Sequence, residues 1–153
     1  MNTPEATRQL IMDMASNSTE IEEIHETEDG TWGFGFSDDS VMTAEWADQP
    51  SRLVLTFFLG TPPEDNRLEA CELLLSFNQM GAETGGVRGG LAPEGEFTLI
   101  YDVPAAPLSK VEFREMVLNF AGLGRKWSRA IQGEIGLPSS SISPNNQLMQ
   151  PLF

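Results

Sequence analysis

The sequence is poor in the residue types on which most enzyme and metal sites depend. It contains one cysteine and one histidine, which excludes an intramolecular disulfide and leaves too few ligands for a structural zinc site. A Ser-His-Asp or Cys-His device needs its histidine beside the nucleophile, whereas His25 stands in an acidic stretch without such a motif. We therefore expect no catalytic residue, no metal and no cofactor, and we interpret Cys71 as a small buried apolar residue.

Basic residues are also scarce. Nine Lys and Arg stand against 23 Asp and Glu, which gives a formal net charge of −14. Phosphate backbones and anionic membrane surfaces repel such a chain, so we expect neither nucleic acid nor membrane as a partner. A neutral or basic protein partner fits the charge, and so does a role for the charge in solubility alone. The composition leaves both interpretations open.

Long apolar runs are absent as well. No stretch approaches the roughly 18 apolar residues of a membrane span, and the opening MNTPEATRQL lacks the basic flank and apolar run of a signal peptide. These features predict a cytoplasmic protein. The hydrophobic content of 40% over 153 residues is enough for one domain with a core. We place that domain at residues 1–132 and a flexible Ser-, Pro- and Asn-rich tail at residues 133–153.

The periodicity of apolar residues predicts an alternation of helices and strands. The acidic stretch 20–29 contains Ile21 and Ile24 and is compatible with either an extra short strand or a solvated loop. The resulting order is α-β-β-β-α-β-β-α, an α+β fold with helices packed on a twisted antiparallel sheet. The expected elements are a helix at 4–16, strands at 32–36, 41–46 and 53–59, a helix at 64–80, strands at 85–92 and 96–103, and a helix at 108–132.

The expected helix at 64–80 is apolar on nearly every side, and such a helix must be covered on nearly every side. In a chain of this length we expect a second copy to supply part of the cover, which predicts a homodimer. The glycines that follow the helix, in GGVRGG, would allow backbones to approach closely at that interface. The alternative is that these apolar residues lie in the core of a monomer. The predicted interface residues are Leu73, Phe77 and Val87.

Three segments resemble the class I type III secretion chaperones, the CesT or Tir-chaperone type. DGTWGFGFSDDSVMTAEW is similar to the opening strands of that family, and LVLTFFLGTPPEDNRLEACELLLSFN is similar to its central strand and dimer helix. GGVRGGLAPEGEFTLIYDVP is similar to its second hairpin. The resemblance covers roughly residues 4–132, while the stretch 18–29 and the tail have no counterpart in it.

The resemblance implies a cytoplasmic, bacterial, homodimeric chaperone that binds the extended N-terminal segment of one secreted effector. Such a chaperone keeps the segment soluble and competent for export without ATP, by adding strands to sheet edges and taking apolar side chains into pockets. The family uses its first helix and adjacent strands for these pockets. The predicted partner contacts are therefore Leu10 and Met14 of the first helix, and Val54 and Phe58 of the strand at 53–59.

A second interpretation of the same charge is an acidic immunity or inhibitor protein that masks the basic surface of a toxin. It would bind a folded partner rather than an extended segment.

Overall fold

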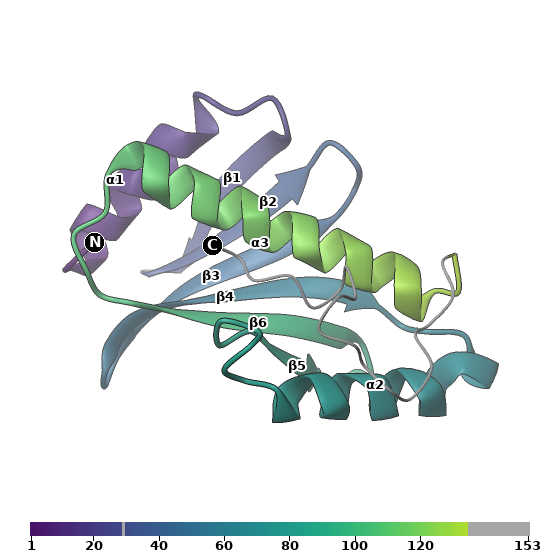
Figure 1. The fold of residues 1–153 in the computed structure, drawn as a ribbon. Coiled ribbons are helices and arrows are strands. Elements are labelled where there is room, and N and C mark those ends of the chain that lie inside the picture. The colour runs from purple at the N-terminus through teal and green to yellow at the C-terminus, as the bar shows by residue number, and fades with distance from the viewer. Residues whose placement is uncertain (29, 135–153) are drawn as a thin grey trace. The chain divides into compact units, whose positions relative to one another are not determined.

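The computed structural model describes residues 1–28 and 30–134, and these form an α+β fold, as expected from the sequence (Figure 1). The acidic stretch forms a strand, so four strands rather than three precede the second helix. The elements are α1 (Pro4–Ala15), β1 (Ile21–Glu28), β2 (Thr31–Phe36), β3 (Val41–Asp48), β4 (Ser51–Gly60), the 3-10 turn η1 (Glu64–Asn66), α2 (Arg67–Gln79), β5 (Arg88–Leu91), β6 (Phe97–Pro104) and α3 (Lys110–Ile131).

The strands form one six-stranded sheet in the order β1-β2-β3-β4-β6-β5, which makes β1 and β5 its edges. The ladders β1–β2, β2–β3 and β5–β6 are antiparallel. On the buried face, Trp32 lies opposite Ala44 and Phe34 lies opposite Met42. All four side chains are at most 1% exposed, so the alternation of TWGFGF decides which face of β2 points into the core.

Strand β1 exists because β2 offers it a partner. Its sequence IEEIHETE has only two apolar residues, and most of its length is exposed. Ile21 pairs with Phe36 and Ile24 pairs with Phe34, and Ile21 is buried. The remaining residues of β1 hold their extended shape through the ladder to β2 and leave their glutamates in solvent. Local sequence alone could not favour this strand over a loop.

The contacts within the chain divide it into two compact units, and the division falls inside β4, β6 and α3. Unit 1 consists of residues 1–56 and 102–118, and α1 lies beside β1 in it (Figure 1). Its core combines α1, the first four strands and the start of α3. The fully or nearly buried side chains of unit 1 include Ile11, Met14, Trp32, Phe34, Phe36, Met42, Leu53, Leu55, Phe113, Met116 and Val117.

Unit 2 consists of residues 57–101 and the chain from 119 onward, and in it α2 lies along β5 (Figure 1). Helix α3 approaches the end of β4 closely at Gly124, where a Cβ atom would overlap the Phe57 ring. The Ser128 hydroxyl donates to the Leu59 carbonyl at 2.8 Å, and the Gln132 amide donates to the Thr61 carbonyl at 3.0 Å. These bonds fix the last turns of α3 against the end of β4.

The expected tail at 133–153 lies outside the described residues except for 133 and 134. Within 1–28 and 30–134, no helix is both long enough and apolar enough to cross a membrane.

Candidate functional site

Two of the predicted partner contacts, Leu10 and Met14, line a cavity of about 260 Å³ in unit 1. Leu10 is half-buried and Met14 is 3% exposed. Sequence reasoning did not anticipate that the far wall of the cavity comes from the start of α3. The remaining lining residues are Asp13 in the last turn of α1, Asn17 just after that helix, and Lys110, Val111 and Arg114 of α3.

Helix α1 presents these residues because its start is well defined. The Thr3 side chain accepts a hydrogen bond from the Ala6 amide at 3.1 Å, and Pro4 occupies the first helical position, where a missing N–H costs nothing. The helix then turns Ile11 and Met14 into the core. Leu10 lies at the border of this buried stripe, which leaves part of its side chain for the cavity.

Helix α3 begins with a capping box. The Glu112 amide donates to the Ser109 hydroxyl oxygen at 3.2 Å, and the Ser109 amide donates to the Glu112 carboxylate at 2.8 Å. This reciprocal pair satisfies two of the free amides at a helix start. The Ser109 amide and hydroxyl hold the pKa of Glu112 below its ordinary value. The box fixes the first turn of α3, so Lys110 and Val111 have defined positions at the cavity.

An ion pair closes one side of the cavity. The Lys110 ammonium lies 2.6 Å from Asp13 Oδ2, and the Gln9 amide donates to Asp13 Oδ1 at 3.1 Å. The ammonium first, and then the amide, lower the pKa of Asp13. Asp13 is therefore ionised at neutral pH and ties α1 to the start of α3 within unit 1.

The other two predicted partner contacts lie elsewhere. Along β4, burial alternates from residue to residue, and the side chains of Leu53, Leu55, Phe57 and Leu59 are at most 1% exposed. Val54 and Phe58 lie on the opposite face and are half-buried. Neither lines the cavity next to α1, and they fall in different units. The structure thus brings together Leu10 and Met14 but does not gather all four residues into one site.

The three predicted interface residues are buried within the protomer. Leu73 is 6% exposed, and Phe77 and Val87 are each 1% exposed. Phe77 packs edge-on against Trp127 of α3, with ring centroids 4.9 Å apart. These side chains present almost no surface to a second copy, which favours the alternative role in the protomer core. The same helix exposes Leu68 and Leu75 instead, at 71% and 69%.

The glycine-rich strand also serves the protomer. A Cβ atom on Gly89 would lie 2.6 Å from the Leu74 side chain of α2. The Asn78 side chain pairs with the same glycine, accepting from its amide at 2.6 Å and donating to its carbonyl at 3.1 Å. The close approach expected from GGVRGG is therefore that of α2 onto β5 in one chain.

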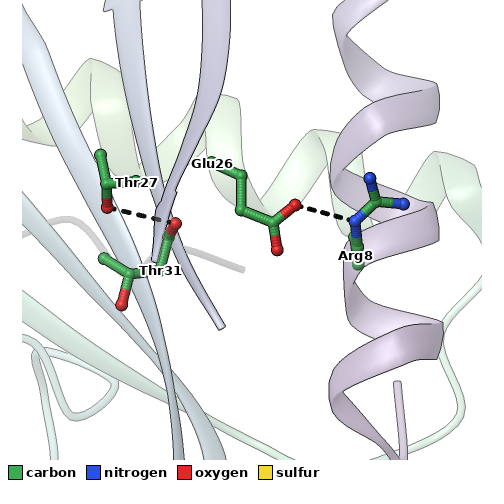
Figure 2. Close-up of polar contacts among 4 residues, drawn as sticks. All are labelled: Arg8, Glu26, Thr27 and Thr31. Atoms are coloured by element: carbon green, nitrogen blue, oxygen red, sulfur yellow. Dashed lines mark hydrogen bonds and ion pairs between the residues drawn. The ribbon is translucent and has the colours of Figure 1, made fainter. Parts of the chain in front are cut away.

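A second cavity, of about 510 Å³, lies at the start of α1 in unit 1. Figure 2 shows the ion pair at its border, in which Arg8 Nε reaches Glu26 Oε2 of β1 at 2.8 Å. The Glu26 carboxylate raises the pKa of Arg8. The same view shows the Thr27 hydroxyl donating to the Thr31 carbonyl across the β1–β2 turn. Trp32 also lines this cavity, and its indole N–H has no acceptor among the described residues.

His25 and Cys71 stand apart from both cavities. His25 is an exposed residue of β1 whose imidazole covers Gly33 on the neighbouring strand. Cys71 is a half-buried free thiol on α2. Among the described residues, no three His, Cys, Asp or Glu side chains come together as metal ligands would.

Sequence reasoning missed Lys110, Val111 and Arg114. A signal was present, because KVEFR places two cations four residues apart at a helix start in a chain with only nine Lys and Arg. Their relation to Leu10 and Met14 depends on tertiary contacts that no local pattern reveals.

Comparison with solved structures supports the fold. One chain of the crystal structure of the ExsC–ExsE complex matches with a TM-score of 0.69 at 18% identity, over 86% of this chain and 97% of that chain. A chain of the HopA1–SchA chaperone–effector complex matches with a TM-score of 0.60 at 19% identity, over 85% and 95% of the two chains. No curated protein matched the sequence.

Comparison with family models gives the identity. The model of the Tir chaperone protein (CesT) family matches residues 10–128, a range that contains the three resembling segments and all but the first turns of α1. This range covers well over half of the 153 residues. The chain belongs to the Tir chaperone protein (CesT) family.

Proposed function

We propose that this protein is a type III secretion chaperone that binds the extended N-terminal segment of a cognate effector and keeps it soluble and competent for export. The observation that carries the proposal is membership of the Tir chaperone family over residues 10–128. The two solved structures compared above are complexes, and one is described as a chaperone–effector complex. The proposal requires no chemical step, since burial of apolar side chains and strand pairing supply the binding energy.

The surface of unit 1 offers two means of holding an extended segment. The cavity lined by Leu10, Met14 and Val111 is open to an apolar side chain. Strand β1 is an edge of the sheet, and an edge strand is a template for an added strand. At the other edge, Asn78 already occupies the amide and carbonyl of Gly89. These features favour β1 as the edge that receives the partner.

The proposed functional form is a homodimer. The exposed Leu68 and Leu75 stand seven residues apart on α2, and therefore on the same side of the helix. A monomer gains nothing from two exposed leucines on one helix face, whereas a second copy would bury them. The proposed interface therefore centres on these two residues, while Leu73, Phe77 and Val87 are buried in the protomer core.

The runner-up function is an acidic immunity or inhibitor protein, which the net charge of −14 favours. The two functions differ in the state of the partner. An immunity protein covers a folded basic surface, so its binding weakens steeply with salt. A chaperone holds an unfolded segment largely through apolar side chains, so its affinity for the partner depends less on salt concentration.

Limited proteolysis of the complex tests the proposal. The protein is co-expressed with a candidate secreted protein encoded beside it, and the purified complex is digested and analysed by mass spectrometry. We expect a protected N-terminal segment of the partner that is cleaved rapidly when the partner is alone. Protection of a folded domain without any such segment, together with loss of the complex at high salt, would favour the immunity function instead.

A further inference from the structure

The cavity between α1 and the start of α3 differs in charge from the rest of the chain. Among the described residues, two basic side chains line it, Lys110 and Arg114, and one acidic side chain, Asp13. The lining thus carries a formal charge of +1, while the whole chain carries −14. Its apolar part consists of Leu10, Met14 and Val111.

The positive charges of Lys110 and Arg114 destabilise the start of α3. Lys110 and Arg114 stand four residues apart on one helix, where like charges repel and destabilise the helix by a few tenths of a kcal/mol. Lys110 is also the first residue of α3, where a cation interacts unfavourably with the helix dipole. Asp13 offsets this cost for Lys110 through the 2.6 Å ion pair. No described carboxylate does the same for Arg114, which stands half-buried at the cavity.

We propose that this cavity selects a partner segment in which an apolar residue and an Asp or Glu occur two positions apart, the apolar side chain entering between Leu10, Met14 and Val111 and the carboxylate pairing with Arg114. The inference rests on the proposed function and specifies the partner chemistry at one site. In an extended segment, residues two apart point to the same side and lie about 7 Å apart. The two side chains can therefore reach the cavity and its border together.

Size and charge both fit this occupant. A volume of about 260 Å³ lies below the roughly 300–1,000 Å³ of pockets for drug-sized ligands, so it suits one side chain rather than a folded surface. The guanidinium of Arg114 can hold a carboxylate with two parallel hydrogen bonds. The rest of the acidic chain repels an acidic segment. The pairing with Arg114 therefore favours the one alignment of the partner segment that brings its carboxylate to this site.

Peptide selection tests the inference. A library of short random peptides displayed on phage is selected against the wild-type protein, R114Q, R114E and K126E. Lys126 is the matched control, because it is an exposed residue of the same helix that does not line the cavity. Circular dichroism confirms that each variant is folded before selection.

On the wild type and on K126E we expect enrichment of Asp or Glu two positions from Leu, Ile, Met or Phe. On R114Q this acidic preference disappears while the apolar preference remains, and on R114E it changes to Lys or Arg. For one selected peptide, replacing its carboxylate by the amide should weaken binding to the wild type about fivefold and leave binding to R114Q unchanged, as for a partly exposed charge pair.

Two results overturn the inference. If the wild type enriches apolar peptides without an acidic preference, or if R114Q keeps that preference, the pairing with Arg114 is wrong while the chaperone function stands. If no variant enriches any peptide and the complex contains no protected extended segment, the inference and the proposed function fall together.

Discussion

The side chain of Asn78 binds the backbone of Gly89 as a neighbouring strand would, accepting from its amide at 2.6 Å and donating to its carbonyl at 3.1 Å. Gly89 belongs to the edge strand β5, where it lies opposite Leu99 of β6. The helix therefore satisfies backbone groups that the edge would otherwise expose. This role accounts for the polar Asn78 near the end of α2.

Replacing Asn78 with alanine should lower the free energy of unfolding by about 1–2 kcal/mol, because it removes both hydrogen bonds to Gly89. Urea denaturation followed by circular dichroism measures this change. Q79A is the matched control, since Gln79 is the next exposed residue of α2. An N78A variant as stable as Q79A would show that the paired amide contributes nothing.

Two glycines of α3 should respond in opposite directions to alanine. A Cβ atom added at Gly122 would meet no other atom within 4 Å, so G122A should stabilise the protein by about 0.5–1 kcal/mol through helix propensity. At Gly124 the Cβ would overlap the Phe57 ring, so G124A should destabilise it by about 1–3 kcal/mol. Thermal unfolding measures the change in melting temperature, which should rise for G122A and fall for G124A. Equal changes in the two variants would refute the close approach of α3 to Phe57.

Val111→Glu should weaken partner binding at least about tenfold, since it places a charge at the apolar wall of the cavity beside Leu10. Val111 is 54% exposed, so the fold should tolerate the change. Met14→Glu is a poorer test because Met14 is 3% exposed and the charge would destabilise the core.

The matched control for V111E is Val41→Glu, at a valine of β3 that is 47% exposed and does not line the cavity. Isothermal titration with the partner segment, or co-purification of the complex, compares the two variants. V111E binding as tightly as V41E would remove this cavity from the partner site. Phe58→Glu, on the half-buried face of β4, tests the second predicted region in the same assay.

Light scattering at micromolar concentration should give a dimer for the wild type and a monomer of 16.8 kDa for Leu75→Glu. The substitution places a charge on the exposed leucine stripe of α2, which the proposed interface buries. V41E again serves as the control and should remain dimeric. A wild type that is monomeric at this concentration contradicts the dimer, and a dimeric L75E places the interface elsewhere.

The ion pair of Asp13 and Lys110 should make stability depend on pH at the acidic end. The pKa of Asp13 is lower in the folded protein than its ordinary value, so its contribution is present above that ordinary value, near 4, and is lost as the pH falls through the folded value. Between about pH 5 and pH 3, the wild type should therefore lose more stability than D13N. Chemical denaturation at both pH values measures the difference, with E115Q, at an exposed carboxylate of α3, as the control. Equal losses in the wild type and D13N would exclude this contribution.

The sequence by itself determined the class of fold and the faces of its strongest elements. In TWGFGF the large apolar residues alternate with glycines, and Trp32 and Phe34 are both buried, because successive side chains of a strand point to opposite faces. The helical period placed Ile11 and Met14 together for a similar reason. The three resembling segments were enough to identify the family that residues 10–128 match.

Only the tertiary structure decided what covers each apolar face. The sequence shows that α2 is apolar on several sides, but burial of Phe77 against Trp127 involves residues 50 positions apart. For the same reason the sequence could not place Arg114 of α3 at the same cavity as Leu10. Nor could it choose between strand and loop for residues 21–28, because that strand forms by pairing with β2. Local patterns record which side of an element avoids water, whereas the identity of its neighbour is set by packing across the whole chain.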